Sequence, residues 1–136
     1  MSDGYEGDLN PQEAWQLLAT HPDAVLVDVR TQAEWKFVGI PDATDVGKRL
    51  VQVEWNTATG RNPDFLDELA AHGVRAGPVL FLCRSGVRSI SAAQAATRAG
   101  IGPAYNVTEG FEGALDANKH RGGTGWKASG LPWKQS

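Results

Sequence analysis

The sequence predicts an α/β protein in which helices cover both faces of a parallel β-sheet. Short apolar runs of strand length alternate along the chain with segments of helical spacing. Two of these runs, Ala24–Val29 and Pro78–Cys83, are nearly continuous, which is typical of strands buried on both faces. The length of 136 residues suits one domain better than two, and we treat 1–136 as a single domain.

Composition and charge exclude several classes of protein. A hydrophobic fraction of 41% and a charged fraction of 21% are ordinary for a globular chain with a buried core. The net charge is only -3 and Lys and Arg form no long run, so nucleic acid and anionic membranes are poor candidates as partners. No apolar stretch approaches the roughly 20 residues that span a bilayer. The segment Met1–Asn10 lacks the pattern of a secretory signal, so we expect a cytoplasmic protein.

Two capping boxes mark the helices of the N-terminal half. Asn10 is followed three residues later by Glu13, and Thr31 is followed in the same way by Glu34. In such a box each side chain bonds the backbone N–H of the other residue, which satisfies two amides at the helix start. The first helix is predicted to end near His21. The second helix follows the strand Ala24–Val29 directly.

The middle of the chain is predicted to be rich in loops. A turn is expected over 39–42 and a short strand over 44–46. A third helix is predicted to open at Asn62 and Pro63 and to end at Gly73.

The C-terminal half contains the most regular pattern. The strand Pro78–Leu82 runs directly into Cys83. A helix over Arg88–Ala99 follows and carries small alanines on one face, which suits close packing on a sheet. A last short strand is predicted over Ala104–Val107.

The two ends of the chain are predicted to be less regular. Residues 1–8 are acidic and rich in Gly, and we expect them to be flexible. The segment 116–136 has no clear period, so we expect irregular chain that Trp126 and Trp133 pack onto the domain.

Cys83 is the only cysteine, which excludes an internal disulfide and a structural zinc site built on cysteines. It stands at the carboxyl end of a predicted parallel strand, which is where ligands bind in open α/β sheets. The residues after it, Arg84-Ser85-Gly86-Val87-Arg88-Ser89, form a tight loop that enters a helix. Gly86 allows this loop to turn its N–H groups inward and form an anion site beside the helix N-terminus. Arg84 and Arg88 add two positive charges, so the loop favours the thiolate form of Cys83, which is the nucleophile.

Four stretches resemble the rhodanese-type sulfurtransferases. They follow the order of that family, and no single one is specific by itself. The resemblance as a whole runs from about Leu9 to Trp133. They are the loop Cys83–Ser89, Asp28-Val29-Arg30 with Glu34-Trp35, Asn106-Val107 with Glu109–Gly113, and Gly125–Lys127 with Gly130–Trp133. One departure is visible, since Gly39-Ile40-Pro41-Asp42-Ala43 stands where many members carry Gly-His-Ile-Pro-Gly-Ala.

The resemblance implies a five-stranded parallel sheet and a reaction through a cysteine persulfide. The Cys83 thiolate would take the outer sulfur of a donor such as thiosulfate and pass it to cyanide or to a thiol. The loop residues Arg84, Ser85, Gly86, Val87, Arg88 and Ser89 would bind the substrate and stabilise the persulfide. The partners would be a small-molecule donor and acceptor, or a protein that donates or accepts the sulfur. No metal and no organic cofactor is implied.

Other interpretations of these residues remain open. Only four residues separate Cys83 from Arg88, whereas related phosphatase loops have one more. The shorter loop suits sulfur transfer better than a tetrahedral phosphate. A phosphatase or arsenate reductase is therefore the second enzyme class. A non-catalytic interaction module or a sulfur carrier is a further alternative. Asp28 and Arg30 are expected to form a structural pair near the site, because a buried carboxylate needs a partner. His21 and His72 lie at predicted helix ends, and a nest of backbone amides needs no histidine base.

Overall fold

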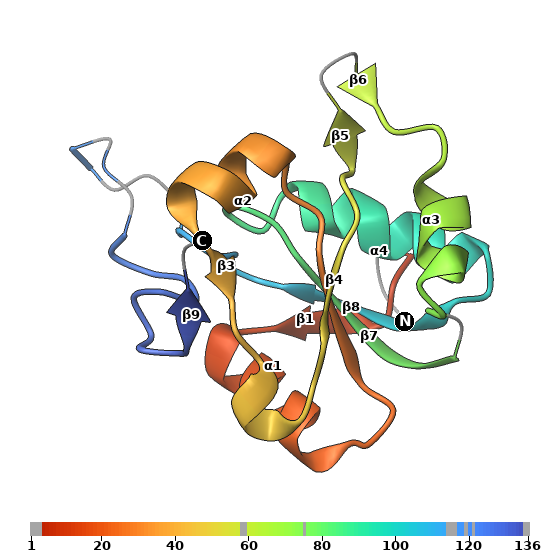
Figure 1. Ribbon diagram of the computed structural model, residues 1–136, viewed down its shortest axis with the longest axis horizontal. Helices are drawn as coiled ribbons and strands as arrows, with labels where there is room; N and C mark the ends of the chain where they lie inside the picture. The colour runs from red at the N-terminus through yellow and green to blue at the C-terminus, as the bar shows by residue number, and fades with distance from the viewer. Residues whose placement is uncertain are drawn as a thin grey trace.

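The computed structural model describes residues 4–57, 60–74, 76–113, 117–118, 120 and 122–134. Its centre is a five-stranded sheet in the order β1-β8-β7-β2-β4, in which neighbouring strands pair in parallel (Figure 1). The strands are β1 (Gly7–Leu9), β2 (Val25–Asp28), β4 (Leu50–Gln52), β7 (Ala76–Leu82) and β8 (Gly102–Val107). Two small antiparallel pairs join β3 (Ile40–Pro41) to β9 (Trp133–Lys134) and β5 (Asn56–Thr57) to β6 (Gly60–Arg61). This sheet confirms the predicted fold class.

Four α-helices flank the sheet in the described part of the chain: α1 (Pro11–Thr20), α2 (Gln32–Val38), α3 (Phe65–Ala71) and α4 (Arg88–Arg98). Both predicted capping boxes are present. The Asn10 side chain accepts from the Glu13 amide at 2.8 Å, and the Thr31 hydroxyl accepts from the Glu34 amide at 3.3 Å. None of the helices in these residues has the length and apolarity needed to cross a bilayer.

Alternate residues of the central strands supply two separate cores, because successive side chains of a strand point to opposite faces. On one face Val27, Val79 and Phe81 pack in a cluster with side chains of α3 and α4. On the other face Leu26 and Leu80 pack with α1 and with the buried Trp126 of the C-terminal segment. Figure 1 shows α3 and α4 on one side of the sheet and α1 on the other.

The strand predicted over 44–46 is wrong. Thr44–Val46 is a short 3-10 helix, and the strand of the central sheet comes later, at β4. Asp42 explains the difference, since its carboxylate accepts from both the amide and the hydroxyl of Thr44 and holds the backbone in a turn. In β4 only Val51 is buried, so this strand carries too short an apolar pattern to be found from the sequence.

The third helix begins later than predicted, at Phe65. Asn62 accepts from the amide of Asp64 through its side chain and donates to the carbonyl of Glu54, so it fixes the loop before the helix and not the first helical turn. The helix ends at Ala71, and Gly73 follows with a φ of 81°.

Each end of the chain contributes a short strand. Gly7 and Asp8, in the segment expected to be flexible, lie in β1 and pair with β8, while residues 1–3 lie outside the described residues. In the C-terminal segment, Trp126 is fully buried and donates from its indole N–H to the Pro132 carbonyl at 2.7 Å. Trp133 is 41% exposed and belongs to β9, so this segment is not wholly irregular.

The parallel topology brings the chemically interesting segments to one edge of the sheet. β2 ends at Asp28, β7 ends at Leu82 and β8 ends at Val107, and these carboxyl ends lie on neighbouring strands. The turn after β8 bonds directly to the Cys83 loop, since the Phe111 amide donates to the Cys83 carbonyl at 2.8 Å.

Candidate active site

The Cys83 thiol is held at the base of its loop. The residue is only 1% exposed, and its Sγ accepts from the Gly86 amide at 3.1 Å and lies 3.2 Å from the Ser89 hydroxyl oxygen. Gly86 has a φ of 94°, and a Cβ at this position would lie 3.1 Å from the Glu109 nitrogen. A side chain at this position is therefore opposed by both the backbone conformation and the available space.

Several backbone amides of the loop donate to no other described residue. They are the N–H groups of Arg84, Ser85, Val87, Arg88 and Ser89. Helix α4 begins at Arg88, and its N-cap residue Val87 supplies no side-chain cap. Unpaired amides at the start of a helix attract negative charge, so the loop beside the thiol is suited to bind an anion.

The turn after β8 forms backbone hydrogen bonds with the Cys83 loop. The Glu112 amide donates to the Arg84 carbonyl at 3.0 Å, next to the bond between Phe111 and Cys83. Gly110 permits this approach, because a Cβ at this position would lie 2.5 Å from the carbonyl oxygen of Cys83. Gly110 also has a φ of 62°, in the left-handed region that favours glycine.

Arg88 forms an ion pair with Glu34 of α2. Its Nη1 and Nη2 donate to the two carboxylate oxygens at 2.9 and 3.0 Å. Burial raises the pKa of Glu34, but the hydrogen bonds from Arg88 and Thr31 and the charge of Arg88 outweigh it, so the pKa lies below its usual value. Burial lowers the pKa of Arg88, but the hydrogen bond and charge of Glu34, followed by the charges of Cys83 and Asp28, raise it overall. Arg88 therefore lies within electrostatic reach of the Cys83 sulfur.

Arg84 is also paired with a carboxylate. Its Nε lies 3.3 Å from a carboxylate oxygen of Glu112, and its side chain is 47% exposed. The sequence suggested that Arg84 and Arg88 act as two cations of the loop, but each is already opposed by a carboxylate. The unpaired amides are consequently the larger source of positive potential beside the sulfur.

Asp28 and Arg30 form a buried ion pair beneath the site. Arg30 donates from Nε at 2.9 Å and from Nη2 at 2.7 Å to the Asp28 carboxylate, and both side chains are 0% exposed. Nη2 also donates to the Gly39 carbonyl at 2.7 Å, and the guanidinium lies 4.2 Å from the centre of the Phe111 ring. These contacts hold together the end of β2, the end of α2 and the turn after β8, so the pair has a structural role.

The site contains residues that were not singled out from the sequence as site residues. In the sequence, Glu34 stands out only as a capping residue, Glu112 and Asn106 only as parts of a family-like motif, and Asp8 not at all. Asn106 lies inside β8 and is 2% exposed, and its side chain accepts from the Ser89 hydroxyl. A polar residue inside an apolar strand was the available signal for Asn106. Nothing local in the sequence indicates that Glu34 pairs with Arg88.

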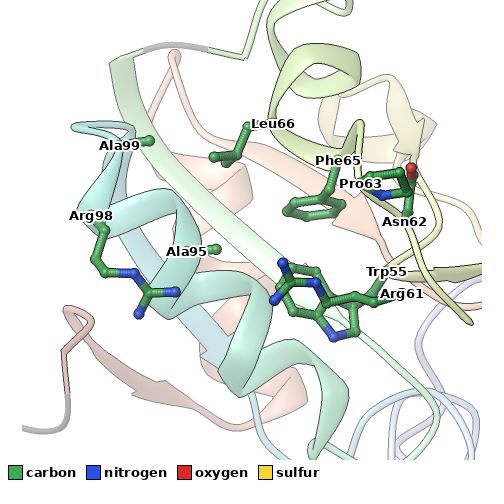
Figure 2. Close-up of a pocket in the computed structure, with 9 residues that line it drawn as sticks. All are labelled: Trp55, Arg61, Asn62, Pro63, Phe65, Leu66, Ala95, Arg98 and Ala99. Atoms are coloured by element: carbon green, nitrogen blue, oxygen red, sulfur yellow. The ribbon is translucent and has the colours of Figure 1, made fainter.

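A separate cavity of about 260 Å³ lies between α3 and α4 (Figure 2). Its lining includes Trp55, Phe65, Arg61 and Arg98, and no residue of the Cys83 loop. In Figure 2 the Arg61 side chain lies over the Trp55 indole, and the guanidinium carbon is 5.2 Å from the ring centre. The cavity is therefore distinct from the cysteine site.

A family model described as the STR4 middle domain matches residues 7–136. The chain belongs to this family. Among solved structures, the crystal structure of Rv0390 from M. tuberculosis is 58% identical to this chain, with a TM-score of 0.91 over 97% of this chain and 99% of that chain.

Two other solved structures share the fold of this chain. The solution structure of a polysulfide-sulfur transferase homodimer from Wolinella succinogenes is 26% identical, with a TM-score of 0.66 over 99% of this chain and 81% of that chain. A rhodanese-like domain protein from Staphylococcus aureus shares the fold at 21% identity, with a TM-score of 0.57 over 77% of this chain and 87% of that chain. The fold implied by the sequence resemblance is thereby confirmed.

Curated relatives of this chain fall into two groups. An uncharacterized protein of Rickettsia rickettsii, named as an RP600 homolog, is 38% identical over 90% of this chain and 92% of its own length. The thiosulfate sulfurtransferase GlpE of Actinobacillus pleuropneumoniae is 29% identical over 92% of this chain and 90% of its own length. Proteins named as sulfurtransferases are thus among its more distant relatives.

Proposed function

We propose that this chain is a sulfurtransferase that carries sulfur as a persulfide on Cys83. The observation that carries the proposal is the group of loop amides around Sγ that donate to no acceptor within the described residues. A persulfide places its negative charge on the outer sulfur, one bond beyond Sγ. Fixed N–H dipoles that surround such a position stabilise the charge without reorganising during the reaction.

The reaction has two steps that balance in atoms and charge. The Cys83 thiolate attacks the outer sulfur of thiosulfate, the S–S bond of thiosulfate breaks, and sulfite leaves with the electron pair. Cyanide or a thiolate then attacks the outer sulfur of the persulfide, and the Cys83 thiolate is the leaving group. Ser85, Gly86, Val87, Arg88 and Ser89 bind the anions through their N–H groups, and Arg84 contributes its own N–H.

Access to the sulfur favours slim donors. Because Cys83 is 1% exposed, a donor must present a single sulfur atom at the end of a narrow chain, as thiosulfate and polysulfides do. The names of the GlpE proteins and of the Wolinella succinogenes protein mention these two donors. Both donors therefore belong in the first experiment.

The proposal treats residues 1–136 as one catalytic domain that uses no metal or organic cofactor. A reactive free thiol is retained most easily in a reducing compartment, so we place the protein in the cytoplasm. A protein that donates or accepts the sulfur would use the same loop.

The test is intact-mass measurement after incubation with thiosulfate or with polysulfide. The native chain is expected to gain one sulfur atom and to lose it to cyanide as thiocyanate, whereas Cys83→Ser gains none. A native chain that gains no sulfur from either donor contradicts the proposal. Arsenate reduction, phosphate-ester hydrolysis and partner binding would then be the activities to measure.

A further inference from the structure

A continuous line of hydrogen bonds joins the Cys83 sulfur to the surface of the sheet. Sγ lies 3.2 Å from the Ser89 Oγ, and Ser89 Oγ contacts Asn106 Oδ1 in a short hydrogen bond. Asn106 Nδ2 donates to Asp8 Oδ1 at 3.1 Å, and the Tyr5 hydroxyl donates to the same oxygen at 2.8 Å. Asp8 and Asn106 are register partners on β1 and β8, so the backbone ladder holds the last link in place.

The chemistry of Asp8 determines the direction of every bond in this line. Asp8 is exposed, and an ionised carboxylate can only accept hydrogen bonds. Asn106 must therefore turn its NH₂ group toward Asp8, which leaves its carbonyl oxygen facing Ser89. A carbonyl oxygen also only accepts, so the single hydroxyl proton of Ser89 goes to Asn106. Ser89 then presents a lone pair, and not a proton, to Cys83.

This direction affects the charge states of Cys83 differently. A neutral thiol can donate its S–H to the Ser89 oxygen, but a thiolate meets a lone pair there and keeps the Gly86 N–H at 3.1 Å as its recorded donor. In a persulfide the charge moves to the outer sulfur, so the inner sulfur no longer needs the Ser89 proton. The line of bonds therefore disfavours the thiolate more than it disfavours the persulfide.

We propose that Asn106 and Asp8 are positioning residues that withhold the Ser89 hydroxyl proton from the Cys83 thiolate and so keep that sulfur strongly nucleophilic. The inference rests on the proposed function insofar as it takes Cys83 to be the nucleophile. A hydrogen bond to an anionic sulfur stabilises the anion and lowers its nucleophilicity. The hydrogen bonds from Ser89 through Asn106 to Asp8 prevent that bond. Asn106 thus has a role in reactivity beyond filling its place in β8.

The other charged groups around the loop leave this argument unchanged. Arg88 is paired with Glu34, and Arg84 is paired with Glu112. The Asp28–Arg30 pair is fully buried beneath the loop. Substitution of Asn106 changes no charge, so its effect on Cys83 reports the direction of the hydrogen bond and not the electrostatic field.

The test measures the rate of Cys83 alkylation by iodoacetamide against pH in the full chain. In Asn106→Ala the Ser89 proton is free to turn to the thiolate, which favours ionisation. We expect the midpoint of the rate profile to fall by about one pH unit, because a hydrogen bond to a charged group is stronger than one between neutral groups and part of the gain is lost to rearrangement. The plateau rate should fall about threefold, since thiolate nucleophilicity follows basicity with a Brønsted slope of about 0.4–0.5.

A second variant keeps the test decisive if loss of the buried amide prevents folding. Asp8→Asn lies at an exposed position and allows the Asn106 amide to flip, so it should shift the profile in the same direction by a smaller amount. Glu6→Gln is the matched control, because it removes the same charge from the same end of the chain without touching Asn106. The control separates loss of charge from loss of the hydrogen-bond direction.

Two results would overturn the inference. One is a midpoint that stays in place or rises in the folded variants, because Ser89 would then not be withheld from the thiolate. The other is an equal shift in Asp8→Asn and Glu6→Gln with none in Asn106→Ala, which would assign the effect to charge alone. Alkylation requires no sulfur donor, so the inference can succeed where persulfide formation fails, and the reverse is also true.

Discussion

The carboxyl and amino ends of the central sheet are surrounded by different environments. Among the described residues the buried polar or charged side chains are Asp28, Arg30, Asn62, Ser89 and Asn106, and all of these except Asn62 lie at the carboxyl end. There Gly110 also presses against the backbone of the Cys83 loop. At the amino end Gly73 and Gly100 also have positive φ angles, and a Cβ at either would meet nothing within 4 Å. Gly77, near the start of β7, is crowded even so, since a Cβ there would lie 2.9 Å from the Asp23 carbonyl oxygen.

The difference shows that the buried polar and charged side chains are concentrated at the carboxyl end of the sheet. Buried charges stabilise only when every partner is in place, so they are avoided in turns that merely reverse the chain. At the carboxyl end they hold the Cys83 loop against β2 and β8. Substitutions that remove one partner at this end should therefore have larger effects than matched substitutions elsewhere.

The largest effect on stability is expected from breaking the buried pair. Arg30→Met leaves the Asp28 carboxylate buried without its counter-charge, which should lower the free energy of unfolding by about 3–5 kcal/mol in urea titrations. A double variant, Asp28→Leu with Arg30→Met, removes both charges and should be less destabilised than the single variant. A single variant as stable as the native chain would show that the pair contributes little to holding the carboxyl end together.

The next effect compares two glycines with similar backbone angles. Gly110→Ala places a Cβ against the Cys83 carbonyl at 2.5 Å, whereas Gly100→Ala places one in open space, with φ of 62° and 78° respectively. We expect a loss of about 2–4 kcal/mol for Gly110→Ala and about 1–2 kcal/mol for Gly100→Ala, because both are strained but only the first is overpacked. Urea unfolding measures the difference, and sulfur loading should fall only in Gly110→Ala.

Equal losses in these two alanine variants would contradict the comparison between the two glycines. Such a result would mean that backbone strain alone, and not the approach to the Cys83 loop, sets the cost at Gly110.

The smallest effect concerns the half-buried pair of Arg88 and Glu34. Because the folded-state pKa of Glu34 is lowered, its stabilisation is present above the ordinary pKa of 4.5 and is lost as pH falls through the lowered value. We expect Glu34→Gln to unfold about 1 kcal/mol more easily than the native chain at neutral pH, and this gap to close in acid. Urea unfolding at neutral and acidic pH measures the gap.

Glu6→Gln serves as the control for this pH dependence, since Glu6 is exposed and has no ion pair among the described residues. Its stability should track that of the native chain at both pH values. A Glu34→Gln gap that stays constant with pH would rule out linkage through this carboxylate.

Much of the fold was predictable because its signals are local. The capping boxes of Asn10 and Thr31 depend on residues three positions apart, and both are present. β2 and β7 are continuous apolar runs, and the β7 run ends directly at Cys83. The edge strands β1 and β4 were missed because each has three residues, and their hydrogen-bond partners on β8 and β2 are distant in sequence.

The sequence by itself determined the α/β class, the position of Cys83 at the end of a strand, and the loop of small and basic residues that follows it. These depend on periodicity and on neighbours along the chain. Only the tertiary structure decided that Glu34 and Glu112 oppose the two arginines, and that Ser89 is tied through Asn106 to Asp8. The reason is that Glu34 lies 54 positions from Arg88 and Asp8 lies 98 positions from Asn106. Parallel pairing of strands brings such distant segments together, and no local pattern in the sequence records it.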